Sequence, residues 1–320
     1  MKDALAPDYR KILDPEVWAF IEKTNSFYPL DTYQRSIAEQ REIYDRMCAA
    51  FAQDYPAGVS ATDTDADGVP VRSYSHRSRK PGVTIIYAHG GGLVVGGLHS
   101  HDDICAEICA ETGYDIVAVD YRLGPEFTRD DALQDMQTVL DWARRGRGGG
   151  FLTVGDSAGG FLSVGLVHGN RRATDILGQV LIYPGLGGYD MPGGSMDRHA
   201  FAPLLTRAEV TGYNDILASG KAAASPGFGM PLQDDDFSDL PPTVSISAEC
   251  DPIADDARIY AEKINAAGGT ALWYEDKGLV HAHLRARHMS RRARNSFDRV
   301  LRAITLIGRG GTLTRSALGD

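Results

Sequence analysis

The stretch Gly155-Asp156-Ser157-Ala158-Gly159-Gly160 follows the short apolar run 151–154. Glycines stand two residues before and two residues after Ser157, where side chains would collide in a sharp turn from a strand into a helix. Such a turn holds a serine hydroxyl exposed at the end of a sheet. The pattern therefore predicts a nucleophilic serine on a sheet built from alternating strands and helices.

A second, rarer motif lies upstream of the serine. His89-Gly90-Gly91-Gly92 directly follows the apolar run 83–88. In serine hydrolases with a strand-turn-helix nucleophile, a loop in this place supplies backbone N–H groups to the negatively charged oxygen of the reaction intermediate. Glycine allows such a backbone to approach the substrate closely, and His89 is expected to shape the loop through hydrogen bonds. The two motifs together make serine hydrolase the leading interpretation.

Composition narrows the class of protein further. The chain has 320 residues, of which 43% are hydrophobic and 24% charged, and its net charge is -10. This acidity argues against a nucleic-acid partner, since phosphate binding needs a basic surface. Residues 1–8 have no apolar core of a secretory signal, and no stretch approaches the ~18 apolar residues of a membrane span. We therefore expect a cytoplasmic protein without stable membrane insertion.

The order of segments predicts an α/β fold with a cap. Residues 1–55 are expected to form a helical cap segment, with helix starts at 14–16 and at 31–32. Residues 56–320 are expected to form the catalytic domain, an α/β-hydrolase fold with a mostly parallel sheet flanked by helices. Residues 185–242 break the alternation of strands and helices, and they are expected to be an insertion that contributes to the cap.

The sheet and its helices can be placed approximately from apolar periodicity and from helix start signals. The predicted strands are residues 69–75, 83–87, 116–119, 151–154, 180–183, 244–247 and 271–274. The predicted helices are residues 101–112, 131–145, 157–168, 206–219, 255–267 and 285–307.

A serine hydroxyl needs a base, usually a histidine that is oriented by an acid. In this kind of hydrolase the chain order is serine, acid, histidine, so both partners are sought downstream of Ser157. Asp251 directly follows a predicted strand and precedes a proline, which favours it over Glu249 and over Asp255, the expected cap of the next helix. His281 follows the next strand, and His283 remains a competitor.

The motif set resembles that of the hormone-sensitive-lipase-like (bacterial family IV) esterases. The motifs that carry the resemblance are His89-Gly-Gly-Gly, Tyr121-Arg-Leu-Gly-Pro-Glu126, Gly155-Asp-Ser-Ala-Gly-Gly, Leu240-Pro-Pro, Asp251-Pro-Ile-Ala-Asp255 and Gly278-Leu-Val-His281. The resemblance implies that Ser157 is the nucleophile, Asp251 the acid and His281 the base. It also implies that Gly91, Gly92 and Ala158 supply the oxyanion N–H groups.

The resemblance further implies hydrolysis of short-chain acyl esters through an acyl-enzyme, without a cofactor. The partner is then a small-molecule ester, and two copies could associate as a homodimer. An amidase or formamidase uses the same parts, and a non-catalytic small-molecule receptor can have the same fold. A metal site is not favoured, because His99, His101, Cys105, Cys109 and the run 234–236 lack the spacing of a closed zinc site. Asp156 and Glu126 are interpreted as structural, and Cys105 and Cys109 as packed apolar residues.

Overall fold

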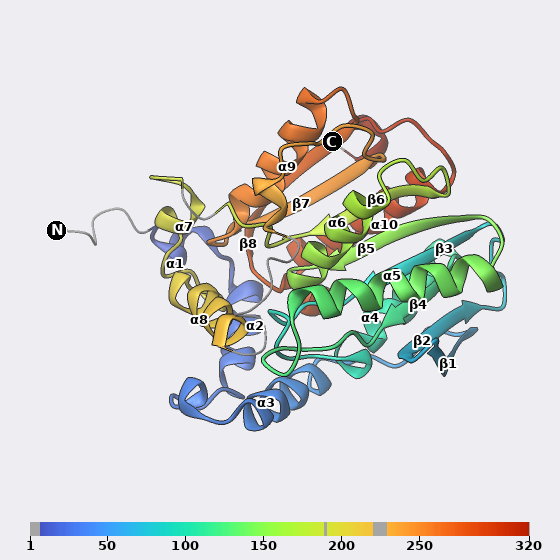
Figure 1. Ribbon diagram of the computed structural model, residues 1–320. Coiled ribbons are helices and arrows are strands. Elements are labelled where there is room, and N and C mark those ends of the chain that lie inside the picture. Colours follow the sequence, from blue (N-terminus) through green and yellow to red (C-terminus); the bar gives the residue numbers. More distant parts are fainter. Residues whose placement is uncertain (1–6, 189–190, 220–228, 320) are drawn as a thin grey trace.

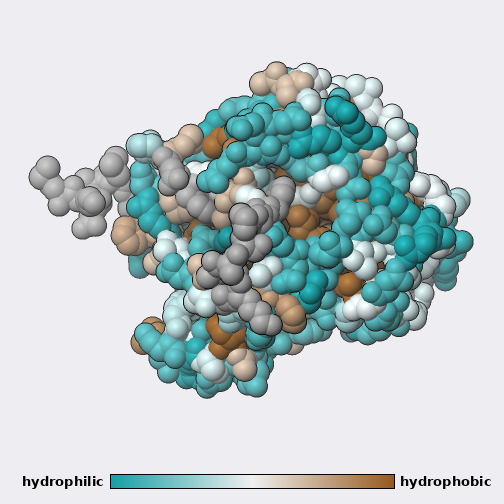
Figure 2. Space-filling model, in the orientation of Figure 1, coloured by the Kyte–Doolittle hydropathy of each residue, from teal (hydrophilic) through white to brown (hydrophobic). Residues whose placement is uncertain are grey.

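The computed structural model describes residues 7–188, 191–219 and 229–319 (Figure 1). Residues 1–6 of the predicted cap segment, and residues 189–190 and 220–228 of the predicted insertion, lie outside the described residues, as does residue 320. On the face that Figure 2 presents, hydrophilic residues predominate.

The centre of the molecule is one eight-stranded sheet in the order β1-β2-β4-β3-β5-β6-β7-β8. The six strands β4, β3, β5, β6, β7 and β8 pair in parallel. At the β1 edge, β1 pairs antiparallel with β2, and β2 pairs antiparallel with β4. The strands are β1 Val59–Ala66, β2 Val69–His76, β3 Val83–Ala88, β4 Asp115–Val119, β5 Gly150–Asp156, β6 Ile176–Ile182, β7 Thr243–Cys250 and β8 Ala271–Val280. The predicted α/β-hydrolase fold is confirmed.

Helices cover both faces of the sheet because the central strands are apolar on both sides. Every residue of β3 is buried. Its Ile86 packs in a core with α5 (Arg129–Gly146), α6 (Ala158–Gly169) and α9 (Ala254–Ala266), while Ile85 packs on the opposite face with α4 (Asp102–Thr112) and α10 (Arg291–Gly308). Figure 1 shows these helices in two layers around the sheet. A strand with two covered faces explains the uninterrupted apolar runs in the sequence.

One strand escaped the sequence analysis. β1 was not predicted because its polar residues are mostly exposed at the sheet edge, so that no apolar alternation marks it. It joins β2 through the two-residue turn Asp67-Gly68, in which both residues have positive φ (56° and 93°). An Asp-Gly pair is a strong signal for such a hairpin turn. The turn signal was therefore present in the sequence, although the strand signal was not.

The N-terminal helices differ partly from expectation. α2 (Pro15–Asn25) begins as predicted, with the Asp14 side chain accepting a hydrogen bond from the Val17 N–H. The predicted helix start at 31–32 is wrong, because only a 3-10 turn, η2 (Thr32–Gln34), forms there. α3 (Ile37–Ala49) begins after Ser36, whose hydroxyl and Glu39 form a reciprocal capping box.

The C-terminal helix is also shorter than predicted. Residues 283–286 form a separate 3-10 turn, η6 (His283–Ala286), and α10 begins only after its N-cap Ser290. His281, Ala282, Leu284 and Arg285 instead line the cavity around the predicted site. The remaining helical elements are α1 (Tyr9–Ile12), η3 (Leu98–Ser100), α7 (Ser195–Arg198), α8 (Arg207–Ser219), η5 (Pro231–Gln233) and η7 (Ser316–Leu318). Within the described ranges, no helix has the length and apolarity to cross a membrane.

A close backbone contact at a glycine joins α6 to β3. A Cβ atom at Gly159 would lie 2.0 Å from the Ala88 carbonyl oxygen, whereas one at Gly169, at the other end of α6, would meet nothing within 4 Å. We expect Gly159→Ala to lower the free energy of unfolding by roughly 1–3 kcal/mol through forced backbone displacement. Gly169→Ala, the matched control, should change it by less than about 1 kcal/mol. Urea unfolding of both variants measures this, and equal midpoints would contradict the role of this contact.

Candidate active site

Ser157 lies at the sharp turn between β5 and α6, as the sequence predicts. Its backbone has φ 54° and ψ -119°, a conformation that non-glycine residues rarely adopt. Side chains at the flanking glycines would collide: a Cβ at Gly155 would lie 2.3 Å from the Gly159 carbonyl oxygen. The Ser157 N–H donates to the Ile182 carbonyl at 2.9 Å, which ties the turn to the neighbouring strand β6. The surrounding packing therefore holds the strained turn in place.

The structure brings the three predicted side chains into one hydrogen-bonded row. His281, directly after β8, has its Nε2 2.8 Å from Ser157 Oγ and its Nδ1 2.7 Å from Asp251 Oδ2. Asp251, directly after β7, is fully buried, and its Oδ1 accepts from the Ile253 N–H at 3.0 Å. The row is consistent with a neutral imidazole whose Nδ1–H donates to the carboxylate and whose Nε2 accepts from the hydroxyl.

The competing acids have other partners. Glu249 accepts from the Gly278 N–H at 2.7 Å, away from the row. The prediction that Asp255 caps α9 is wrong: it lies inside that helix and accepts instead from the Ser195 N–H at 2.6 Å, at the start of α7. The neighbouring Asp256 accepts from three successive N–H groups, those of Leu186, Gly187 and Gly188. The two aspartates thus anchor the insertion, and Asp251 is left beside the imidazole.

The competing histidines are structural. His283 is fully buried, and its two ring nitrogens contact the Val280 carbonyl at 3.0 Å and the Ser296 hydroxyl at 2.8 Å. The His89 Nδ1–H donates to the Gly90 carbonyl at 2.8 Å, and the ring stacks on Tyr121. Burial lowers the pKa of His89 to about 3, so that its ring stays neutral. The expectation that His89 shapes the glycine loop is confirmed.

The predicted N–H donors face the same cavity as Ser157. Gly91, Gly92 and Ala158 all line it, and within the described part of the chain no acceptor is hydrogen-bonded to their N–H groups. Side chains cannot be accommodated in the loop, since a Cβ at Gly91 would lie 2.1 Å from the Val95 carbonyl oxygen and one at Gly92 would lie 2.5 Å from the Tyr213 ring. Free N–H groups at the start of a helix favour an anion there.

Asp156, next to Ser157, fixes the position of the glycine loop. Its buried carboxylate accepts from the Tyr87 hydroxyl at 2.9 Å, from the Gly90 N–H at 3.1 Å and from His101 Nε2 at 3.2 Å. Burial alone would raise the pKa of this carboxyl, but His101, the nearby Arg285 and the Tyr87 hydrogen bond outweigh it and lower the pKa to about 2. The structural role expected for Asp156 is confirmed.

Glu126 is structural as well. It forms a two-pronged ion pair with Arg41 of α3, at 2.7 and 2.9 Å. The same guanidinium donates to the carbonyls of Val94 and Gly124 at 2.8 Å each. One arginine therefore links the N-terminal helices to the segment that follows the glycine loop.

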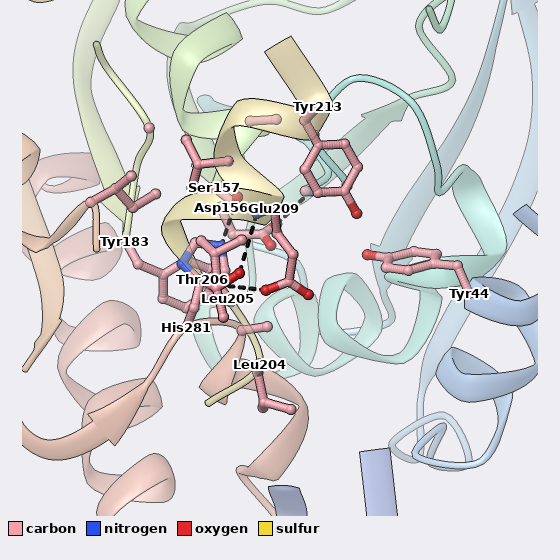
Figure 3. Close-up of a pocket in the computed structure, with 18 of the residues that line it drawn as sticks. Tyr44, Asp156, Ser157, Tyr183, Leu204, Leu205, Thr206, Glu209, Tyr213 and His281 are labelled. Carbon is pink, nitrogen blue, oxygen red and sulfur yellow. Dashed lines mark hydrogen bonds between the residues drawn. The ribbon is translucent and has the colours of Figure 1, made fainter. Parts of the chain in front are cut away.

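The site opens into a cavity of about 420 Å³ that is lined by residues of the sheet edge, of the N-terminal helices α2 and α3, and of α8. Figure 3 shows Ser157 and His281 on one side of it, with Glu209 and Tyr213 of α8 projecting toward the space in front of them and Tyr44 of α3 opposite. The sequence analysis did not single out Tyr44, Glu209 or Tyr213. Apolar periodicity predicts the helices that carry these residues, but nothing in a single sequence indicates that those helices face Ser157.

The sources considered for a metal site do not converge. Among the residues that the structure describes, no three His, Cys, Asp or Glu side chains lie close enough together to hold a metal ion. Cys105 and Cys109 are fully buried in the core between α4 and the sheet, as expected of small apolar residues.

Comparisons with known proteins agree with this geometry. Residues 85–285 match a protein-family model described as alpha/beta hydrolase fold. The chain is 30% identical over 265 residues to an ethyl acetate hydrolase of Pseudomonas putida, covering 77% of this chain and 83% of that protein. It is 28% identical over 272 residues to an acetyl esterase of Salmonella typhi, covering 80% and 81%. A solved structure of a bacterial heroin esterase superposes with a TM-score of 0.80 at 26% identity, over 95% of this chain and 99% of that one.

The buried charge of Asp156 predicts a pH-dependent contribution to stability. The pKa of this carboxyl is lowered in the folded protein, so its contribution is fully present above the unfolded value of 3.8 and is lost as pH falls through about 2. A shift of this size corresponds to about 2 kcal/mol. Urea unfolding should therefore show Asp156→Asn less stable than the unmodified protein at pH 7, with the difference shrinking between pH 4 and pH 2. A difference independent of pH would contradict an ionised Asp156.

Proposed function

We propose that this chain, a carboxylic ester hydrolase that belongs to the alpha/beta hydrolase fold family, cleaves short-chain acyl esters through Ser157, His281 and Asp251. Its relatives are the hormone-sensitive-lipase-like esterases. The observation that carries this proposal is the row of hydrogen bonds from Asp251 through His281 to Ser157. That row ends at a hydroxyl in a cavity that free backbone N–H groups also line.

In the first step, the Ser157 oxygen attacks the ester carbonyl carbon while its proton moves to Nε2 of His281. The imidazolium that forms is stabilised by the buried Asp251 carboxylate, which also keeps the ring in the correct tautomer. The carbonyl π electrons move to the oxygen, which becomes the oxyanion of a tetrahedral intermediate.

The N–H groups of Gly91, Gly92 and Ala158 are the proposed donors to this oxyanion. Their arrangement is rigid, because Asp156 binds the Gly90 N–H and because Ser157 is tied to β6. Donors that are already in place cost no reorganisation during the reaction, and a single one typically contributes ~2.7–4 kcal/mol to catalysis.

Collapse of the intermediate breaks the bond to the alcohol oxygen, which takes the proton from His281 and leaves. The acyl group remains on Ser157. A water molecule then gives its proton to His281 and attacks the acyl carbon, and the second intermediate collapses to the free acid while Ser157 regains its proton. The sum is ester plus water to acid plus alcohol.

Two of the similar proteins bear names that refer to short acyl groups, ethyl acetate hydrolase and acetyl esterase. The proposal of a short acyl group for this chain rests on that similarity. The cavity is lined mainly by apolar and aromatic side chains, which suits the uncharged body of an ester.

Ser157→Ala should abolish labelling by a fluorophosphonate probe and lower kcat/KM for an acetate ester by at least about 10⁴-fold, because the nucleophile is lost. Labelling is read by intact-protein mass spectrometry, and hydrolysis by a chromogenic assay. Ser60→Ala, at an exposed position of β1, is the control and should label as the unmodified protein does. Labelling that persists in Ser157→Ala would refute the assigned nucleophile.

A series of 4-nitrophenyl esters tests the acyl preference. We expect kcat/KM to be highest for acetyl to butyryl esters and to fall at least about tenfold by decanoyl, since a short acyl site excludes a long chain. The Ser157→Ala variant, prepared in the same way, gives the background rate of hydrolysis. A maximum at decanoyl would contradict the short-chain proposal while leaving the assigned nucleophile untouched.

A further inference from the structure

Glu209 is a charged side chain that the proposed reaction does not use, although it lines the cavity in front of Ser157. It lies in the first turn of α8, and its carboxylate accepts from the Thr206 N–H at 2.5 Å and from the Tyr33 hydroxyl. Both donors are uncharged. In the described part of the chain, Glu209 forms no ion pair with a lysine, arginine or histidine, and its two hydrogen-bond donors leave its negative charge in place.

The other charged side chains of the cavity are already engaged. Asp156 is bonded beneath the glycine loop. Arg129 donates to the Asn214 side chain at 2.7 Å. Arg285 donates to the Ser100 carbonyl at 2.7 Å and to the Tyr44 hydroxyl at 2.9 Å. Of the two carboxylates that line the cavity, Glu209 is therefore the one that accepts only from a backbone N–H and a hydroxyl in the described part of the chain.

Three tyrosines surround this carboxylate. Tyr28 and Tyr33 come from the segment between α2 and α3, and Tyr213 lies four residues after Glu209, on the same face of α8. Desolvation and the nearby Glu209 charge together raise the pKa of all three hydroxyls, that of Tyr213 to about 12. The rings and the carboxylate are thus close neighbours, although the rings come from two separate parts of the cap.

This group lies next to the reaction centre. The Tyr213 ring packs against Gly92, where a Cβ would come within 2.5 Å of it. Figure 3 shows the Glu209 carboxylate projecting into the space between Ser157 and His281 on one side and the Tyr44 hydroxyl on the other. A substrate whose carbonyl oxygen reaches the Gly92 N–H would therefore place one of its substituents beside Glu209 and Tyr213.

Aromatic faces and a carboxylate attract the same kind of ligand. The ring quadrupole presents a negative face, which binds cations, most effectively those with alkyl groups that lose little hydration. A carboxylate adds a full negative charge in a partly desolvated cavity, where it acts more strongly than in water. Uncharged donors hold Glu209 in position without cancelling its charge.

We propose that Glu209, with the rings of Tyr28, Tyr33 and Tyr213, binds an alkylated ammonium group in the alcohol part of the ester substrate. The inference rests on the proposed function, in which the acyl part is short and the alcohol part fills the larger share of the cavity. Glu209 and the tyrosines are then residues that determine specificity for esters of amino alcohols.

Three acetate esters of similar size test the proposal: acetylcholine, its uncharged isostere 3,3-dimethylbutyl acetate, and the anionic 3-acetoxypropanoate. We expect kcat/KM for the cationic ester to exceed that for the neutral one by about tenfold or more. Equal values for these two esters overturn the proposal. A preference for the anionic ester also overturns it, and assigns the charge recognition to Arg285 instead.

Glu209→Gln removes the charge but keeps an amide oxygen that can accept from Thr206 and Tyr33, and glutamine also serves at this position of a capping box. We expect the ratio of kcat/KM for acetylcholine to that for the neutral isostere to fall about tenfold. Glu262→Gln, on α9 outside the cavity and paired with Arg258, makes the same change in net charge and should leave the ratio unaltered. An unchanged ratio in Glu209→Gln overturns the proposal.

Tyr33 is 58% exposed at the rim, so it can be replaced without opening the core. Tyr33→Phe keeps the ring, and we expect it to retain most of the ratio, whereas Tyr33→Leu should lower the ratio severalfold. Equal ratios in the two variants would exclude this ring from the binding group. Hydrolysis of the neutral ester and labelling of Ser157 report on the proposed function separately, so loss of those signals is distinguishable from loss of cation preference.

Discussion

Ser157 is held in a backbone conformation that a serine does not adopt by itself, and the packing around it supplies the constraint. Gly155 and Gly159 let β5, α6 and the end of β3 approach within distances that a single methyl group would prevent. Because β3 continues into the glycine loop, the same close approach sets both the nucleophile and the N–H groups opposite it. The distance between the two functional loops is therefore a property of the sheet, and it does not depend on flexible side chains.

A second set of contacts joins this rigid centre to the N-terminal helices and to the segment between β6 and β7. Arg41 of α3 donates to the carbonyls of Val94 and Gly124 and pairs with Glu126. Arg285 of η6 donates to the hydroxyl of Tyr44, which also lies in α3. On the other side of the cavity, the carboxylates of Asp255 and Asp256 bind N–H groups of the insertion. Both segments are thus attached by buried or half-buried charges to the elements that carry the row Asp251, His281 and Ser157. This attachment gives the cavity a defined wall.

Arg285 and Arg287, two arginines of the segment after His281, are both buried but have different kinds of partners. Arg287 is buried and pairs with the carboxylates of Asp103 and Glu107. Arg285 is equally buried but donates only to neutral acceptors at the edge of the cavity, with Asp156 as a nearby carboxylate. Arg287, directly after η6, thus forms a core ion pair with α4, and removal of one partner from such a pair is costly.

Much of the fold and of the candidate site could be read from the sequence, because their signals are local. Glycine spacing around Ser157 reports a steric requirement of the turn, and uninterrupted apolar runs report strands with two covered faces. The order of serine, Asp251 and His281 places all three at one edge of a parallel sheet, where the structure brings them within hydrogen-bond distance. The polar edge strand β1 and the start of α3 were missed, since packing and capping at those places outweigh apolar periodicity.

The tertiary structure alone decided which side chains face the nucleophile. Glu209 lies more than 170 positions after Tyr28 and Tyr33, and their meeting depends on how α8 packs against the segment between α2 and α3. The same is true of Asp255, whose partner is a distant N–H group and not the helix in which it lies. A sequence specifies local geometry through steric and hydrogen-bonding rules within a few residues, whereas the lining of a cavity depends on long-range packing that no short pattern encodes.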